Sequence, residues 1–192
     1  DPSSMTEAEW FAVTGQALEL AARELRVLGT DTAAARATSK DWATQLAQQI
    51  ITPNSSPGAP GGDLLLPSED RGDLFGGHTT HLSTADQSGM FVSLTQTLGP
   101  NMGSKVVTPG LGFLYASTLG GYLGRMNPGE RARSNICPFM VLKDGEVILV
   151  LGAAGGGRIP PAVVHAITRV IDFGMSLPEA LAEPRVVAAR GG

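Results

Sequence analysis

The 192-residue chain is poor in the residues that build disulfides, metal sites and aromatic cores. It has one cysteine, three histidines and 5% aromatic residues. The single cysteine, Cys137, excludes an internal disulfide and a Cys-x-x-Cys metal site. The three histidines have no acidic cluster near them in the sequence, which argues against a metal site. We therefore expect neither a metal nor another cofactor.

Strong charge and long apolar runs are also missing. The net charge is -4, so no basic field attracts a phosphate backbone, and nucleic acid is not an expected partner. No run approaches the roughly 18 apolar residues of a spanning helix, so we expect no membrane insertion. The chain starts at Asp1 without an initiator methionine or a signal-peptide pattern. The compartment, cytoplasmic or exported, is therefore left open.

What the chain does have is 42% hydrophobic residues, which favours a globular core. Apolar residues at helical spacing predict a helix over residues 6–27, and Ser39 can cap a second helix that runs to about residue 51. The Pro-, Gly- and Ser-rich residues 52–62 predict a flexible linker. The alternative for this segment is an ordinary interdomain loop.

Beyond residue 78 the pattern changes to strands. A turn over residues 86–89 predicts a hairpin that brings Thr79 and Thr97 toward the same end. Two apolar runs flank Asp144-Gly145 and predict a second hairpin with a tight primed turn.

A final apolar pattern predicts a helix over residues 160–173, ended by Gly174. Helices on either side of stacked hairpins predict a layered α+β fold.

Thr79 stands at the head of the first strand, within Gly76-Gly77-His78-Thr79-Thr80-His81-Leu82-Ser83. A threonine hydroxyl becomes nucleophilic when a base takes its proton, and the nearest base is its own α-amine once the preceding bond is cut. If Thr79 is such a nucleophile, the chain is a precursor that is cleaved between His78 and Thr79. The alternative is a pair of β-branched residues that only begin a strand.

A series of short motifs follows in order along the sequence. They are Thr79-Thr80-His81-Leu82-Ser83, Asp86 and Gly89, Thr97, Val141-x-Lys143-Asp144-Gly145, Gly152-x-x-Gly155-Gly156-Gly157-Arg158-Ile159, Ile171-Asp172-Phe173-Gly174, and Glu179-Ala180-x-x-x-x-Pro184-Arg185. In their order and most of their spacing, they resemble the small subunit of γ-glutamyltransferases, which are N-terminal-nucleophile (Ntn) hydrolases.

This resemblance implies a four-layer αββα sandwich that segments outside this chain complete. It also implies three parts: residues 1–51 as the helical end of the large-subunit region, residues 52–78 as a linker ending at the processing site, and residues 79–192 as the catalytic small-subunit region. The expected partners are a small-molecule substrate and the remaining large-subunit segment of the same precursor.

The resemblance also assigns catalytic roles. Thr79 matches the nucleophile, Gly155 and Gly156 match the oxyanion-hole glycines, and Thr97 matches a threonine that orients the nucleophile. A strand followed by a Gly-rich turn and a helix can aim backbone N–H groups at one point. For Thr97 the alternative is an ordinary strand threonine. For the glycines it is a structural turn; a dinucleotide loop is disfavoured, because the GxGxxG spacing is missing.

The remaining histidines receive no catalytic role. An Ntn nucleophile needs no second base, so we expect His81 to be packed or solvated and His165 to be structural.

The substrate-recognition positions depart from the family pattern. Gly99 stands where the family has Asn, and Ala116-Ser117-Thr118-Leu119-Gly120-Gly121-Tyr122 replaces a segment whose last acid binds the substrate amino group. Ser134-Asn135 replaces a Ser-Ser pair. Gly99, Thr118, Ser134 and Asn135 are therefore our candidate substrate-binding residues. Loss of the carboxylate removes most of the recognition of an ammonium group.

The expected function is a γ-glutamyltransferase-like hydrolase or acyltransferase, autoprocessed before Thr79, that acts on an amide or related acyl bond of a non-standard substrate. Two alternatives stay open. One is a C–C bond hydrolase of a specialised, alkylproline-type pathway that uses the same threonine. The other is a non-catalytic scaffold relative.

Overall fold

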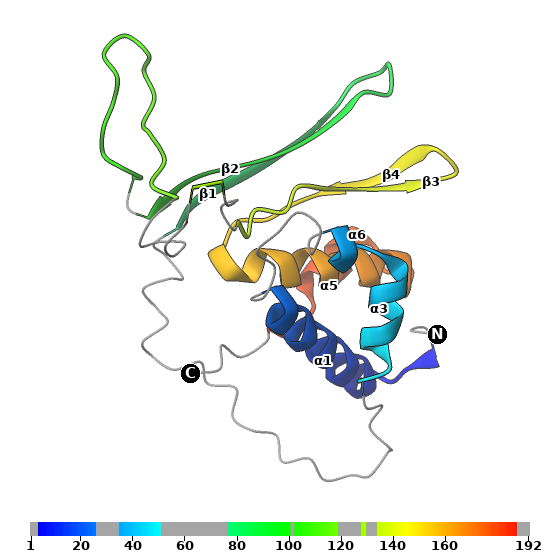
Figure 1. The fold of residues 1–192 in the computed structure, drawn as a ribbon. Helices are drawn as coiled ribbons and strands as arrows, with labels where there is room; N and C mark the ends of the chain where they lie inside the picture. The colour runs from blue at the N-terminus through cyan, green and yellow to red at the C-terminus, as the bar shows by residue number, and fades with distance from the viewer. Residues whose placement is uncertain are drawn as a thin grey trace. The chain divides into compact units, whose positions relative to one another are not determined.

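The computed structural model describes residues 4–25, 35–50, 77–100, 102–118, 128–129 and 134–187. The predicted linker 52–62 lies outside these residues, as do Leu119 to Tyr122 of the candidate recognition segment. The chain divides into two compact units (Figure 1). One contains residues 1–64 and 165–192, and the other contains residues 65–164. The fold is α+β, as predicted.

The first unit, called the helical unit below, begins with α1 (Glu7–Leu25) and α3 (Lys40–Ala47). At the start of α1, Thr6 and Glu9 form a capping box, in which the Thr6 N–H donates to Glu9 Oε2 (2.9 Å) and the Glu9 N–H donates to Thr6 Oγ1 (3.3 Å). At α3 the Ser39 hydroxyl accepts from the Trp42 N–H (3.2 Å), which confirms the predicted cap. Both helices start within a residue or so of their predicted starts.

The core of the helical unit is aromatic, and it encloses a histidine and an arginine. Trp10 is only 5% exposed, and its ring lies 4.9 Å from the His165 ring and 5.7 Å from the Phe173 ring. The guanidinium of Arg169 lies 4.9 Å from the Trp10 ring centroid and 5.9 Å from that of Phe11 on α1. His165 is fully buried in this cluster, as a structural histidine would be.

Helix α5 (Ile159–Ile171) begins in the second unit, and its last residues belong to the helical unit. Gly174, with φ of +67°, follows its end and confirms the predicted stop. The sequence analysis did not predict the next helix, α6 (Leu177–Ala182). At its start the Glu179 carboxylate accepts from the Ser176 N–H (2.9 Å) and hydroxyl (2.6 Å).

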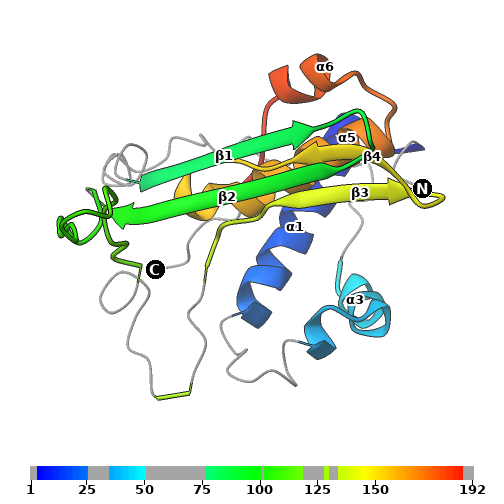
Figure 2. The ribbon, with the colours of Figure 1, turned by 90° about the horizontal axis from the view of Figure 1, so that it is seen from above.

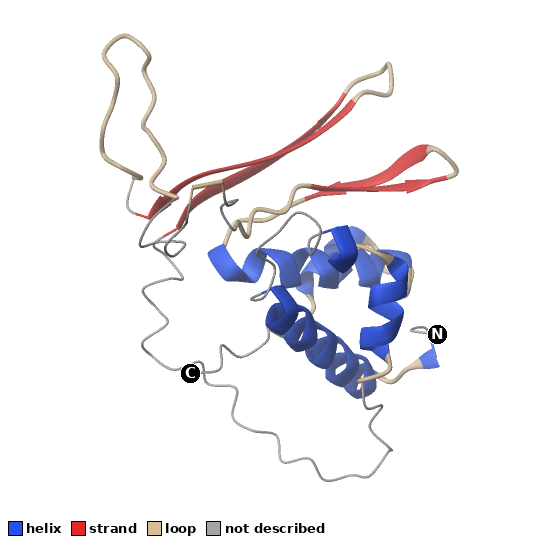
Figure 3. Ribbon diagram, viewed as in Figure 1, coloured by secondary structure: helices blue, strands red, loops and turns tan. Residues whose placement is uncertain are grey.

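The second unit, called the strand unit below, contains two antiparallel hairpins (Figures 1 and 3). The first joins β1 (Gly77–Ala85) to β2 (Phe91–Pro100). In its turn, one oxygen of Asp86 accepts from the Ser88 N–H (2.8 Å) and the Met90 N–H (3.0 Å). These bonds from the backbone to the Asp86 side chain stabilise the turn between the two strands.

The second hairpin joins β3 (Phe139–Lys143) to β4 (Glu146–Leu151). Asp144 and Gly145 both have positive φ (53° and 87°), which confirms the predicted primed turn. The Ser93 hydroxyl of β2 donates to the Leu151 carbonyl (3.2 Å) and accepts from the Phe139 N–H (3.2 Å). The two hairpins are therefore linked, as two separate two-stranded sheets that overlap when seen from above (Figure 2).

The two faces of the β1–β2 hairpin differ in an unusual way. Its polar face carries Thr79, His81 and Ser83 opposite Thr97, Thr95 and Ser93. Most of these polar side chains are buried or half-buried, whereas Leu82, Val92 and Leu94 on the other face are 40%, 41% and 41% exposed.

Among the described helices, none is long and apolar enough to cross a membrane.

Candidate active site

Thr79 lies on the polar face of the hairpin, directly opposite Thr97. The Thr79 hydroxyl donates to Thr97 Oγ1 at 3.2 Å, and the Gly99 N–H donates to the same oxygen at 3.0 Å. Both threonines are half-buried. Thr97 therefore fixes the direction in which the Thr79 oxygen points, as an orienting residue would.

The ladder between the strands is irregular just before Thr79. Gly77 pairs with Pro100 while Thr79 pairs with Thr97, so Leu98 and Gly99 of β2 lie opposite the single residue His78. Bulges of this kind redirect side chains and are frequent beside active sites. The peptide bond that we expect to be cleaved is thus next to a break in strand pairing.

Gly99 lies close to the candidate recognition segment. A Cβ added to Gly99 would lie 2.6 Å from the Ser117 carbonyl oxygen and 3.5 Å from Thr118 Cγ2. The Ser117 N–H also donates to the Leu98 carbonyl (2.8 Å). The structure therefore brings Gly99 and Thr118 together beside Thr97, within one cluster of predicted site residues.

Gly155 and Gly156 lie in the turn between β4 and α5, where a short 3₁₀ helix, η4 (Gly156–Arg158), begins. Their φ angles are +137° and +58°, and the Arg158 N–H donates to the Gly155 carbonyl at 3.1 Å. The first N–H groups of a helix have no partner within the helix, so they are available to a ligand. This local geometry is compatible with the role of oxyanion donors.

Ser134 and Asn135 are both exposed. The Ser134 hydroxyl accepts from the N–H of Ile136, two residues further on, at 3.2 Å. Within the described part of the chain, no hydrogen bond joins either residue to Thr79, so their role in substrate binding stays a prediction.

Sequence reasoning missed one part of this face. His81 bonds Thr95 through Nδ1 (2.8 Å) and Ser83 through Nε2 (3.0 Å), and Thr95 is only 6% exposed. The alternation of Ser93, Thr95 and Thr97 was the signal that could have placed three hydroxyls on one face.

Comparisons with known proteins give the chain its family. Residues 4–190 match the Gamma-glutamyltranspeptidase family. The chain is 36% identical over 126 residues to a glutathione hydrolase proenzyme of Pseudomonas sp. (strain A14), covering 57% of this chain and 22% of the relative. It is 40% identical over 114 residues to an acylase ACY 1 proenzyme of Pseudomonas sp. (strain V22), covering 56% and 20%.

A solved structure shows the same likeness. The γ-glutamyltranspeptidase of Pseudomonas nitroreducens, complexed with L-DON, is 35% identical and covers 58% of this chain and 66% of its own, with a TM-score of 0.50. The chain spans only about a fifth of the length of the two curated relatives above. Because the family match extends over nearly all of it, the chain belongs to the γ-glutamyltranspeptidase family of Ntn hydrolases.

Proposed function

We propose that this chain carries the catalytic threonine of a γ-glutamyltransferase-like hydrolase or acyltransferase, and that Thr79 becomes its nucleophile after cleavage behind His78. The observation that carries the proposal is the hydrogen bond from the Thr79 hydroxyl to Thr97. In this arrangement Thr97 directs the nucleophile, and family membership supports the chemistry.

The first reaction is cleavage of the chain itself. The Thr79 oxygen attacks the His78 carbonyl carbon, the peptide C–N bond breaks, and an ester joins the two parts. The hydroxyl proton passes to the departing nitrogen, which becomes the free α-amine of Thr79. Water then hydrolyses the ester, which leaves a carboxylate on His78 and restores the Thr79 hydroxyl. An α-amine has a pKa near neutrality, so it can act as the base in later turnovers.

The second reaction is acyl transfer from the substrate. The Thr79 oxygen attacks the acyl carbon while its α-amine takes the hydroxyl proton and returns it to the leaving group. Water or an acceptor amine then takes the acyl group from Thr79. The N–H groups of Gly155 and Gly156 stabilise the oxyanion of each step, and one such donor is typically worth about 2.7–4 kcal/mol.

The substrate that we propose differs from an ordinary γ-glutamyl peptide. Gly99 provides no side chain for binding, and Thr118 replaces part of a segment that contacts the amino group in the family. The relatives support a broader range of acyl groups, because their printed names include both glutathione hydrolase and acylase.

We further propose that the rest of the precursor covers the exposed apolar face of the β1–β2 hairpin and completes a four-layer αββα sandwich. Leu82, Val92 and Leu94 present this face. Much longer relatives, described as proenzymes, support a division into a helical part (1–51), a linker (52–78) and a catalytic part (79–192).

Intact-mass measurement of the full-length precursor tests the nucleophile. We expect the wild type to divide between His78 and Thr79 at neutral pH, whereas Thr79→Ala stays whole. Thr79→Ser, which keeps the hydroxyl, is the matched control and should still cleave. Folded wild-type protein that stays whole would contradict the proposal and favour a scaffold role.

A substrate panel then tests recognition. It contains a γ-glutamyl anilide, simple acyl amides and β-dicarbonyl compounds. We expect an acyl amide to be the best substrate. Turnover of the anilide at ordinary family efficiency would refute the diverged specificity, and cleavage of the β-dicarbonyl compound alone would establish C–C bond hydrolysis instead.

A further inference from the structure

The polar face of the β1–β2 hairpin holds a histidine that the chemistry above does not use. His81 lies two residues after Thr79 on the same face and opposite Thr95. Its Nδ1 bonds Thr95 Oγ1 (2.8 Å) and its Nε2 bonds Ser83 Oγ (3.0 Å). Because a hydroxyl can donate or accept, both bonds persist in either neutral tautomer of the ring. The imidazole is therefore held from both sides.

The His81 ring lies directly against Gly152, the first residue after β4. A Cβ added to Gly152 would lie 2.7 Å from His81 Cγ and still closer to Nδ1 and Cε1. Unlike Gly155 and Gly156, Gly152 does not have a φ in the left-handed region. The three atoms nearest to such a Cβ all belong to the His81 ring, so the ring restricts this position to glycine.

This contact lies where the nucleophile strand meets the Gly-rich turn. Gly152 is three residues before Gly155, and the preceding residue, Leu151, accepts a hydrogen bond from Ser93 of β2. The hairpin thus holds the start of the turn at two points, through Ser93 and through the His81 ring.

We propose that His81 is a positioning residue, whose ring packs on Gly152 and fixes the Gly155–Gly156 turn relative to Thr79. This inference rests on the proposed function, since it assigns those glycines as oxyanion donors. The ring takes no proton from the nucleophile, because the freed α-amine of Thr79 does so. A turn displaced by about 1 Å can lower a rate about 100-fold.

The test is a double-mutant cycle in the full-length precursor with His81→Ala, Gly152→Ala and both together. Its readouts are the self-cleavage half-time, and kcat and KM on the panel substrate that the wild type turns over fastest. We expect Gly152→Ala to lower kcat about 100-fold, with a much smaller change in KM, because the new methyl group displaces the turn. In the double variant the methyl group occupies space that the ring has left, so kcat should recover about tenfold.

Two further variants separate this role from general destabilisation. Gly15→Ala in α1 is the matched control, because a Cβ there would lie 3.4 Å from Val186 Cγ1, an ordinary contact, and kcat should not change. His81→Phe keeps a ring on Gly152 but removes both hydrogen bonds, so it should retain more of kcat than His81→Ala. If Gly152→Ala does not fold, we expect the double variant to fold, because removal of the His81 ring makes room for the new methyl group.

The proposal is overturned if Gly152→Ala keeps wild-type kcat, or if the two single losses multiply in the double variant. Failure of both Gly152 variants to fold, while His81→Ala folds, also overturns it. A wild type without self-cleavage and turnover would refute the proposed function as well. If the wild type is active and the two single losses of kcat multiply in the double variant, only the proposed role of His81 is refuted.

Discussion

The helical core and the polar face of the β1–β2 hairpin both bury polar side chains, but these side chains bond different kinds of partner. In the helical core, Arg169 donates to the carbonyls of Ala180 (3.4 Å), Glu183 (3.3 Å) and Pro184, and His165 bonds the Val186 carbonyl (2.9 Å). These partners are backbone groups that fix the C-terminal segment. The polar groups of this core are therefore structural.

On the hairpin, the polar side chains bond one another instead. Thr79 bonds Thr97, and His81 bonds both Thr95 and Ser83. Hydroxyls and a neutral imidazole can each donate and accept hydrogen bonds, whereas an arginine can only donate. Burial of polar groups alone therefore does not mark a site; what differs between the proposed active site and the helical core is the kind of partner that each buried polar group bonds.

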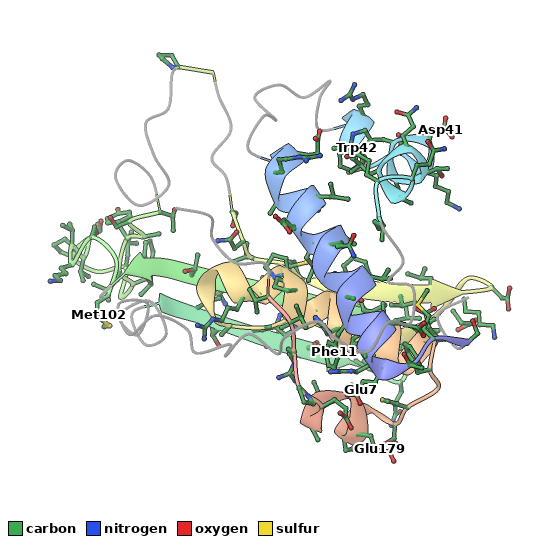
Figure 4. The ribbon with its side chains drawn as sticks, turned by 90° about the horizontal axis from the view of Figure 1, so that it is seen from below. Glu7, Phe11, Asp41, Trp42, Met102 and Glu179 are labelled. Carbon is green, nitrogen blue, oxygen red and sulfur yellow. The ribbon has the colours of Figure 1, made fainter. Side chains whose placement is uncertain are left out.

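The largest effect should come from breaking the aromatic core. Trp10→Ala removes the ring that packs on His165, Phe173 and Arg169, and we expect it to lower the free energy of unfolding by about 3–5 kcal/mol. Urea unfolding of the full chain measures this change. Trp42→Ala is the matched control, because Trp42 is only half-buried in α3 (Figure 4). Equal losses in the two variants would contradict a core centred on Trp10.

A smaller effect should distinguish alanine at Gly99, in the candidate active site, from alanine at Gly89, in the turn of the same hairpin. Gly99 and Gly89 have nearly equal φ (80° and 84°), so alanine at either position costs about 1–2 kcal/mol of backbone strain. At Gly99 alone the new methyl group would lie 2.6 Å from the Ser117 carbonyl, whereas nothing lies within 4 Å at Gly89.

We therefore expect Gly99→Ala to lose more stability than Gly89→Ala and to lower turnover, while Gly89→Ala leaves turnover unchanged. Thermal unfolding and the panel substrate measure both effects. Equal losses of stability and turnover in the two variants would show that the contact with Ser117 is unimportant.

Structural features that depend only on residues adjacent in the chain could be predicted from the sequence. The cap at Ser39, the turn at Asp144-Gly145 and the stop at Gly174 each follow from the conformational preferences of one or two residues. Helix α6 carries such a signal too, since Ser176 and Glu179 have capping-box spacing, but the helix is too short for an apolar period.

The candidate site was only partly predictable. Pairing of Thr79 with Thr97 followed from the hairpin, because turn position fixes strand register. The contact of His81 with Gly152 did not, because it joins residues 71 positions apart on two different hairpins. The motif contains Gly152 but does not explain why a glycine stands there. Only the fold shows that the His81 ring occupies the space that a Cβ would take.

The smallest effect concerns His165, and it tests what burial of a polar group costs in the helical core. Burial lowers the pKa of His165 below its ordinary value of 6.5, and the positive charges of Arg169 and Arg185 lower it further, against the hydrogen bond to Val186. The unfolded chain therefore binds a proton more readily than the folded one. The stabilisation by neutral His165 is complete above about pH 6.5, and it is lost as the pH falls below that value.

Urea midpoints at pH 7.5 and pH 5.5 test this sign. We expect the wild type to lose more stability over this interval than His165→Gln, which has no titrating ring but keeps a donor for the Val186 carbonyl. The lowered pKa values of Glu9 and Glu179 do not interfere, because their contributions are lost only as the pH falls below about 4.5. A wild type and a His165→Gln variant with equal pH dependence would show that burial of His165 does not oppose its protonation.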